Sequence, residues 1–194
     1  MIHLIANKLV TELQTLPFVE KITGIVKPSK ITINTVVKTF PLAYNTNPTE
    51  CSQSELMAFV PDSTKRSIIY FEDYGTTMTN MDNQMIYFQG NMRLIVWFNY
   101  HKISPAMHDP SLIALNVLKV IPTQLGNFDG LLGVNVDVTG QLPNDAGVFS
   151  RYSYAEERQQ YITHPYDYVA FTLRADFRVR AECIDDITIC TQLC

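Results

Sequence analysis

Residues 169–180 alternate between apolar and polar side chains along almost their whole length. One parity holds six apolar residues, Val169, Phe171, Leu173, Ala175, Phe177 and Val179. The other parity holds Thr172, Arg174, Asp176, Arg178 and Arg180. A period of two places the two sets on opposite faces of a strand, so the pattern predicts a β-strand with one buried face.

Two segments have helical periodicity instead. In residues 2–16, apolar side chains recur every three or four positions, and Pro17 follows them, which predicts a helix with one buried stripe. The second helix is predicted over residues 109–121. Asp109 is a good N-cap, Pro110 suits the first helical position, and Pro122 ends the segment.

Further strands are predicted at residues 67–73, 85–90, 92–103 and 132–139. Residues 94–98 are apolar on both parities, which indicates a central strand covered on both faces. Residues 21–38 predict a hairpin that turns at Pro28 and Ser29, and residues 74–84 predict a polar turn.

The predicted order of elements is a helix, several antiparallel strands, a second helix and more strands. It has no alternating strand–helix rhythm, so a parallel sheet is not expected. We expect a single α+β domain over residues 1–194, with an antiparallel sheet packed against two main helices. Residues 141–165 are predicted as a long polar loop insertion, and residues 181–194 as a C-terminal tail.

Composition narrows the function classes. Charged residues make up 18% of the chain, the formal net charge is −4, and no basic block is present. Proteins that bind duplex nucleic acid as their main task usually show a basic patch, so that task is not expected. Low surface charge indicates that a partner covers part of the surface. No signal-peptide pattern and no run of about 18 apolar residues is present, so no membrane partner is expected.

Candidate catalytic and metal-binding groups are weak. His101, His108 and Asp109 could form a metal site, but the end of a strand followed by a capped helix explains them better. The four cysteines, Cys51, Cys183, Cys190 and Cys194, lack the paired CxxC spacing of structural zinc and are read as free thiols. Adjacent Glu72 and Asp73 point to opposite faces of a strand. We therefore expect no enzyme activity, no catalytic residue, no cofactor and no metal.

Aromatic and arginine side chains point to an interface instead. The polar loop contains Tyr152, Tyr154, Arg158 and Tyr161, and tyrosine and arginine are enriched at interface hot spots. Some of these tyrosines could simply cover the edge of the sheet. The polar face of the last strand adds Arg174, Arg178 and Arg180.

The order of elements resembles the tail-terminator and neck (head–tail connector) ring proteins of tailed bacteriophages. Residues 2–16, 93–103, 109–121, 132–139 and 169–180 match that order, and residues 161–173 are similar to the family's entry into its last strand. The Asn-, Thr- and Tyr-rich loops suit a virion component, for which a crAss-like phage is one candidate source. The long segment 41–62 and the three C-terminal cysteines depart from the pattern.

The resemblance implies a structural virion protein that is assembled in the host cytoplasm and located in the neck or tail. It would form a homo-oligomeric ring that joins the portal or connector to the tail, with DNA only as cargo passing through the lumen. The loop at residues 152–161 would reach a neighbouring ring. Arg174, Arg178 and Arg180 would line the lumen or make intersubunit salt bridges, and Asp176 among them favours the salt bridges. The implied copy number, six or twelve, stays open. The alternatives are a small intracellular metal-dependent enzyme and a monomeric adaptor protein.

Overall fold

The computed structural model describes residues 1–44, 56–82, 84–143, 146–153 and 163–181. It shows an α+β fold in which two helices pack on a mixed eight-stranded sheet. The helices are α1 (Ile2–Leu13) and α2 (Pro110–Val120). The strands are β1 (Lys21–Ile33), β2 (Val36–Tyr44), β3 (Leu56–Ala58), β4 (Ser67–Met81), β5 (Met85–Asn99), β6 (Gln124–Phe128), β7 (Leu131–Gln141) and β8 (Tyr166–Arg180).

The strands lie in the order β3-β2-β1-β4-β5-β8-β7-β6. Neighbouring strands are antiparallel except β1 and β4, which pair in parallel from Lys21 with Ile68 to Val26 with Glu72. The expected antiparallel sheet is therefore mostly but not fully correct. The chain makes the β1–β2 hairpin and β3 before it returns, so β4 enters beside β1 in the same direction.

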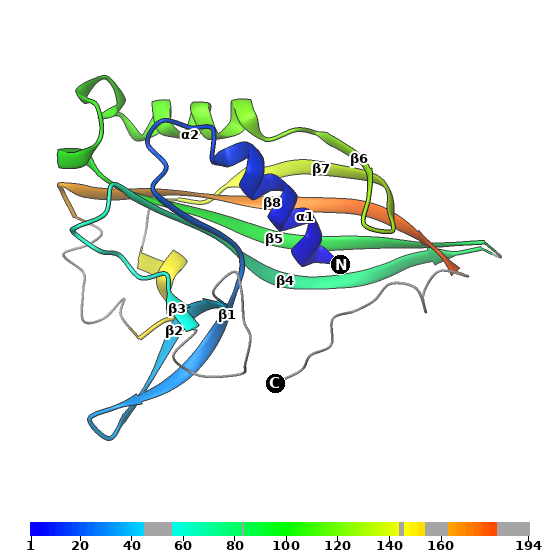
Figure 1. The fold of residues 1–194 in the computed structure, drawn as a ribbon, viewed down its shortest axis with the longest axis horizontal. Coiled ribbons are helices and arrows are strands. Elements are labelled where there is room, and N and C mark those ends of the chain that lie inside the picture. The colour runs from blue at the N-terminus through cyan, green and yellow to red at the C-terminus, as the bar shows by residue number, and fades with distance from the viewer. Residues whose placement is uncertain (45–55, 83, 144–145, 154–162, 182–194) are drawn as a thin grey trace.

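One face of the sheet is covered by both helices (Figure 1). The apolar stripe predicted over residues 2–16 is buried, although α1 itself ends at Leu13, and the six apolar residues of β8 are buried in the same core. Asp109 caps α2 by accepting a hydrogen bond from the Ser111 backbone N–H at 2.8 Å. The sequence-based assignment of both helices and of the buried face of β8 is confirmed.

A second, smaller core lies on the other face of the sheet. Here Trp97, Tyr70 and Tyr168 are covered by Phe149 and Tyr152 from the segment after β7. Within the predicted polar insertion, residues Ala146–Phe149 form a 3-10 helix, and Ser153 exchanges hydrogen bonds with Thr39 at 2.9 and 3.0 Å. Tyr168 and Ala170, on the parity of β8 opposite to its helix-side residues, are buried in this second core.

The β1–β2 hairpin forms, but its turn is at Asn34 and Thr35, both with positive φ (49° and 70°), and not at Pro28. Pro28 faces Pro41 across the hairpin. Because a two-residue turn makes alternate pairs hydrogen-bonded, this pair falls where the backbone nitrogens point away from the partner strand. Two prolines can therefore sit inside the ribbon without removing a hydrogen bond between its strands.

The region of β4 and β5 also differs from expectation. Residues 74–81, predicted within a polar turn, continue β4, and residues 90–91 do not interrupt β5. Gly90 lies under the start of α1, where an added Cβ would be 2.6 Å from Ile2 Cδ1. The glycine thus allows the helix to approach the sheet and does not end the strand.

Candidate functional site: the polar face of the sheet

The sheet has a polar face that the described segments leave open. It is formed by the ends of β4, β5, β8 and β7 that lie beyond the second core, on the same side of the sheet as that core. Its side chains are exposed or half-buried, and they include Thr77, Thr79, Tyr87, Gln89, Asn135, Asp137, Arg174, Asp176 and Arg178. We call this surface the polar face.

Three charged groups on the polar face, Arg174, Asp137 and Asp176, are paired within the chain. Arg174 Nη2 lies 2.9 Å from Asp137 Oδ2, and Arg174 Nε lies 3.1 Å from Asp176 Oδ2. The Gln89 amide donates to Asp176 Oδ1 at 3.1 Å. Exposed ion pairs of this kind contribute about 0–1 kcal/mol to stability. The ion pairs therefore fix the positions of these side chains on the surface and contribute little to the stability of the fold.

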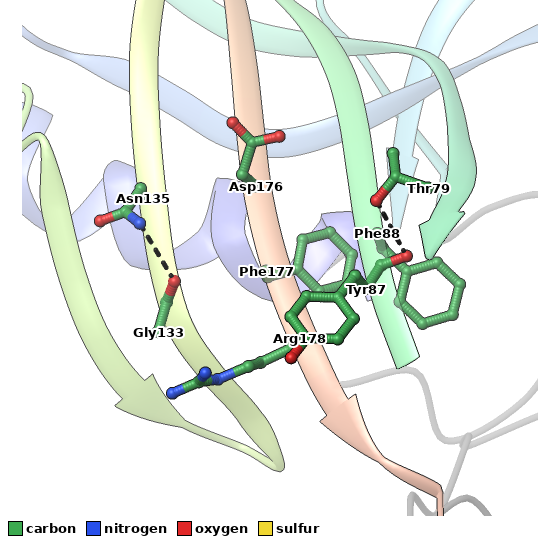
Figure 2. A pocket seen from close by; sticks show the side chains of 8 residues that line it. All are labelled: Thr79, Tyr87, Phe88, Gly133, Asn135, Asp176, Phe177 and Arg178. Carbon is green, nitrogen blue, oxygen red and sulfur yellow. Dashed lines mark hydrogen bonds between the residues drawn. The ribbon is translucent and has the colours of Figure 1, made fainter. Parts of the chain in front are cut away.

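A shallow cavity of about 340 Å³ lies on the polar face near the end of β8 (Figure 2). Its lining includes the ring of Tyr87, the amide of Asn135 and the charged groups of Asp176 and Arg178. An added Cβ at Gly133, which has a positive φ of 57°, would be 3.6 Å from Arg178 Nε, so the guanidinium lies across β7 at that residue. The cavity combines a ring, an amide and both charge signs, which suits recognition of a polar surface.

A buried carboxylate, Glu72, lies at the boundary between the polar face and the second core. It is 1% exposed and accepts hydrogen bonds from the Tyr152 hydroxyl and, at 3.2 Å, from the Tyr74 hydroxyl. Arg93 Nη1 is 3.6 Å and Arg151 Nη1 is 3.9 Å from Glu72 Oε2. Burial, followed by the negative charge of Glu72, raises the pKa of Tyr74.

This Glu72 cluster connects distant parts of the chain. Both guanidinium groups stack on the Tyr74 ring, with centroid distances of 4.6 Å for Arg93 and 4.9 Å for Arg151. Tyr152 and Arg151 belong to the segment after β7, whereas Glu72 and Tyr74 belong to β4. Two arginines around one carboxylate satisfy its charge, and the cluster attaches the segment after β7 to the sheet.

The structure places the predicted interface residues in different settings. Tyr152 is 2% exposed and its ring belongs to the second core, so in this chain it is a packing residue. Arg174, Arg178 and Arg180 lie on one face of β8, as predicted, and the partners of Arg174 are in the same chain. Tyr154, Arg158 and Tyr161 lie outside the described residues. The interface role of all these residues stays a prediction.

The histidines that suggested a metal site surround an aromatic ring. The Tyr100 ring centroid is 5.4 Å from that of His108 and 5.9 Å from that of His164. The ring centroids of His101 and His164 are 6.0 Å apart. The Tyr100 hydroxyl donates to Asp167 at 3.0 Å, and burial together with this bond raises the pKa of Tyr100. Within the described ranges, no three His, Cys, Asp or Glu side chains form a metal-binding group, and all four cysteines lie outside those ranges.

Sequence reasoning missed the Glu72 cluster. Glu72 was considered only as half of an acidic pair, and Tyr152 as an interface residue or as one of the tyrosines that cover the edge of the sheet. The one local signal was a carboxylate in an otherwise apolar strand, residues 67–71 being largely apolar. Its partner hydroxyl is 80 positions away in the chain, and no local pattern connects the two residues.

No protein-family model matches the chain, and no curated protein shows significant sequence similarity to it. The described part of the chain contains no helix with the length and apolar character needed to cross a membrane.

Proposed function

We propose that this chain is a structural subunit of a homo-oligomeric ring in the neck or tail of a tailed bacteriophage. The ring joins the portal or connector to the tail and surrounds the channel through which DNA passes. The polar face is the observation that carries this proposal. Both helices pack on one side of the sheet, whereas on the other side the second core ends before the polar face, whose side chains are exposed or half-buried.

The charges on the polar face suit repeated contacts between copies. Arg174, Arg178 and Arg180 alternate with Asp176 along β8, and Asp137 adds a second carboxylate on β7. A surface that carries both signs in a fixed order favours one docking register over others. Contacts between unlike surfaces of identical subunits close into a ring when the rotation allows it. Salt bridges that Arg174 now makes within the chain would be shared with, or exchanged for, bridges to a neighbour.

Native mass spectrometry and negative-stain electron microscopy of the purified protein test the proposal. Closed rings with a central opening are expected, either alone or after addition of portal and tail proteins. Arg178→Glu should reduce ring formation, because it reverses a charge on the polar face. Lys119→Glu makes the same change on exposed α2 and should leave the rings intact.

The alternatives give different results in the same experiments. A chain that stays monomeric at every concentration and with its candidate partners would refute the ring and favour an adaptor. A stoichiometric metal in elemental analysis of the purified protein would favour a metal-dependent enzyme. Rings that form equally well with Arg178→Glu would exclude the polar face as the contact between subunits and leave lining of the lumen as its role.

A further inference from the structure

The β1–β2 hairpin projects from the body of the protein (Figure 1). β1 pairs with β4 only as far as Val26, and β2 pairs with β3 only from Leu42 onward. Between these points, among the described strands, residues 27–41 pair only with the other strand of the hairpin, and near its base Thr39 also bonds Ser153 and the Pro41 carbonyl accepts from the Phe59 backbone N–H. We call this segment the arm. Its seven residue pairs, at about 3.3 Å per residue, make a ribbon about 23 Å long.

A ribbon of two strands is marginally stable in water by itself. The arm nevertheless exposes apolar side chains at its tip, with Val36 55% and Val37 59% exposed. Neighbouring residues of a strand point to opposite faces, so both faces of the tip carry an exposed β-branched side chain. Ile31 adds a third, at 37% exposed. Such a tip gains stability when it packs against another surface.

The charge of the arm indicates what that surface is. Lys27, Lys30 and Lys38 are its charged residues, and residues 27–41 contain no acidic side chain. The whole chain has a net charge of −4, so removing the three arm lysines leaves −7 on the remainder. The body of a second copy therefore offers the opposite charge to the arm.

A surface that suits the arm, which we call the acceptor, lies at the other end of the sheet (Figure 1). Beyond Glu72, β4 has β5 on one side and, within the described part of the chain, no strand on its other side. This edge, residues 73–81, exposes Met78 (60%) and Met81 (59%). Their cross-strand partners are Phe88 and Ile86, which lie on one face of β5.

The irregular pairing between Met78 and Asn80 accounts for this placement, because it puts two methionines three positions apart on the same face. Methionine side chains adapt to irregular apolar partners. Residues 67–92 include Asp73 and Asp82 but no lysine or arginine. Arg178 and Arg180 of β8 lie nearby on the opposite face of the sheet.

We propose that the arm of one copy adds to the free edge of β4, residues 73–81, in a second copy of this chain. The arm would extend the neighbour's sheet through backbone hydrogen bonds. Val36 and Ile31, which share one face of the ribbon, would pack against Met78 and Met81, and Val37 would lie on the other face of the extended sheet. Because arm and acceptor are different surfaces, each copy can give one contact and receive one. The inference rests on the proposed function, in which such contacts close into a ring.

Two variants of the full chain test this contact. Val36→Ser with Val37→Ser changes the arm, and Met78→Asp with Met81→Asp changes the acceptor. Analytical ultracentrifugation over a range of concentrations should show self-association by the unchanged chain. In each variant the dissociation constant should rise at least about tenfold. A mixture of the two variants should form a one-to-one dimer and nothing larger, because one intact arm and one intact acceptor remain.

Leu112→Ser with Leu115→Ser is the matched control, since both leucines are exposed apolar residues on α2. It should associate like the unchanged chain. Circular dichroism and thermal unfolding establish that each variant is folded. Lys27→Glu with Lys30→Glu keeps the tip intact and should also weaken association, and this effect should shrink at high salt.

Several outcomes would overturn the inference. An unchanged chain that stays monomeric at every concentration refutes it, as does arm-variant association equal to that of the control. If the mixed variants form no dimer, the arm and acceptor are not partners. A short fluorescent DNA duplex tests nucleic acid as the occupant: duplex binding that is lost in Lys27→Glu with Lys30→Glu, with self-association unchanged, would also refute it.

Failure of this inference and failure of the proposed function are distinguishable. Closed rings that form equally well from the unchanged chain and the arm variant would refute the arm contact and support the ring. Arm-dependent association into open filaments or simple dimers would support the arm contact and refute the ring.

Discussion

Removing the buried carboxylate of Glu72 should destabilise the protein strongly. Glu72→Ala takes away the shared acceptor of two tyrosine hydroxyls and the counter-charge of Arg93 and Arg151. Breaking a buried ion pair by deleting one partner typically costs about 3–5 kcal/mol, because the remaining charge is left uncompensated.

The lower end of that range applies here, because the two arginine side chains keep access to water. They are 19% exposed for Arg93 and 37% for Arg151, whereas Glu72 is 1% exposed. We expect Glu72→Ala to lower the free energy of unfolding by about 3 kcal/mol. In a chain of this size each kcal/mol shifts Tm by about 2–4 °C, so Tm should fall by about 6–12 °C.

Urea denaturation followed by circular dichroism measures this change, with Glu72→Gln and Asp73→Ala as comparisons. Glu72→Gln keeps an acceptor for the hydroxyls and loses the charge, so its cost should be about 1–2 kcal/mol. Asp73 is the exposed neighbour on the same strand, and its loss should cost less than about 1 kcal/mol. If Glu72→Ala and Asp73→Ala were equally stable, the cluster would not attach the segment after β7 to the sheet.

Three other predictions test the fold. Phe177→Ala should cost about 3–5 kcal/mol in chemical denaturation, and an equal loss from alanine at the exposed position after it would contradict the assigned faces of β8. Gly90→Ala should cost about 1–3 kcal/mol, and adding Ile2→Val, which removes the contacting methyl group, should recover part of the loss; no recovery would argue against that contact. The Arg66 backbone N–H, and secondly a lysine ammonium, hold the pKa of Glu20 below its usual 4.5, so its stabilisation is present above pH 4.5 and is lost as pH falls further. Glu20→Gln should therefore flatten the acid limb of unfolding curves measured across pH, and an unchanged limb would contradict this.

The local pattern of apolar and polar residues was sufficient to predict the helices and strands that have one buried face. The helix at the N-terminus and the strand at β8 were predicted correctly because burial on one side leaves a clear period in the sequence. The capped start of α2 was equally readable, since Asp109 and Pro110 act within one turn. These are signals that a few neighbouring residues carry by themselves.

Elements whose side chains are mostly exposed were misread. The far half of β4, from Asp73 to Met81, is polar and exposed, and its strand conformation comes from pairing with β5. β6, whose residues are exposed or half-buried, was not predicted at all. Pro28 was predicted to be in a turn, but it lies inside a strand of the hairpin. It is tolerated there because it faces Pro41 across the hairpin, and no local pattern shows that pairing.

For the candidate site, too, local patterns predicted one part and missed another. The polar face of β8 was predicted because its residues belong to one alternating strand. The Glu72 cluster was not, because its members come together only when the segment after β7 folds back over β4. The free edge of β4 also depends on where β1 stops pairing, which follows from the full topology.

The two faces of β8 differ in how much the fold depends on their side chains. Its helix-side residues are buried along the whole strand, but on its other side burial is deep only at Tyr168 and Ala170. Arg174 is the first charged residue beyond the point where the second core ends. A half-exposed surface there would tolerate many polar residues, and the ion pairs present contribute little to stability. The particular order of arginine and aspartate is therefore not needed to hold the chain together. In the proposed ring, the polar face is therefore better suited than either core to contacts between copies.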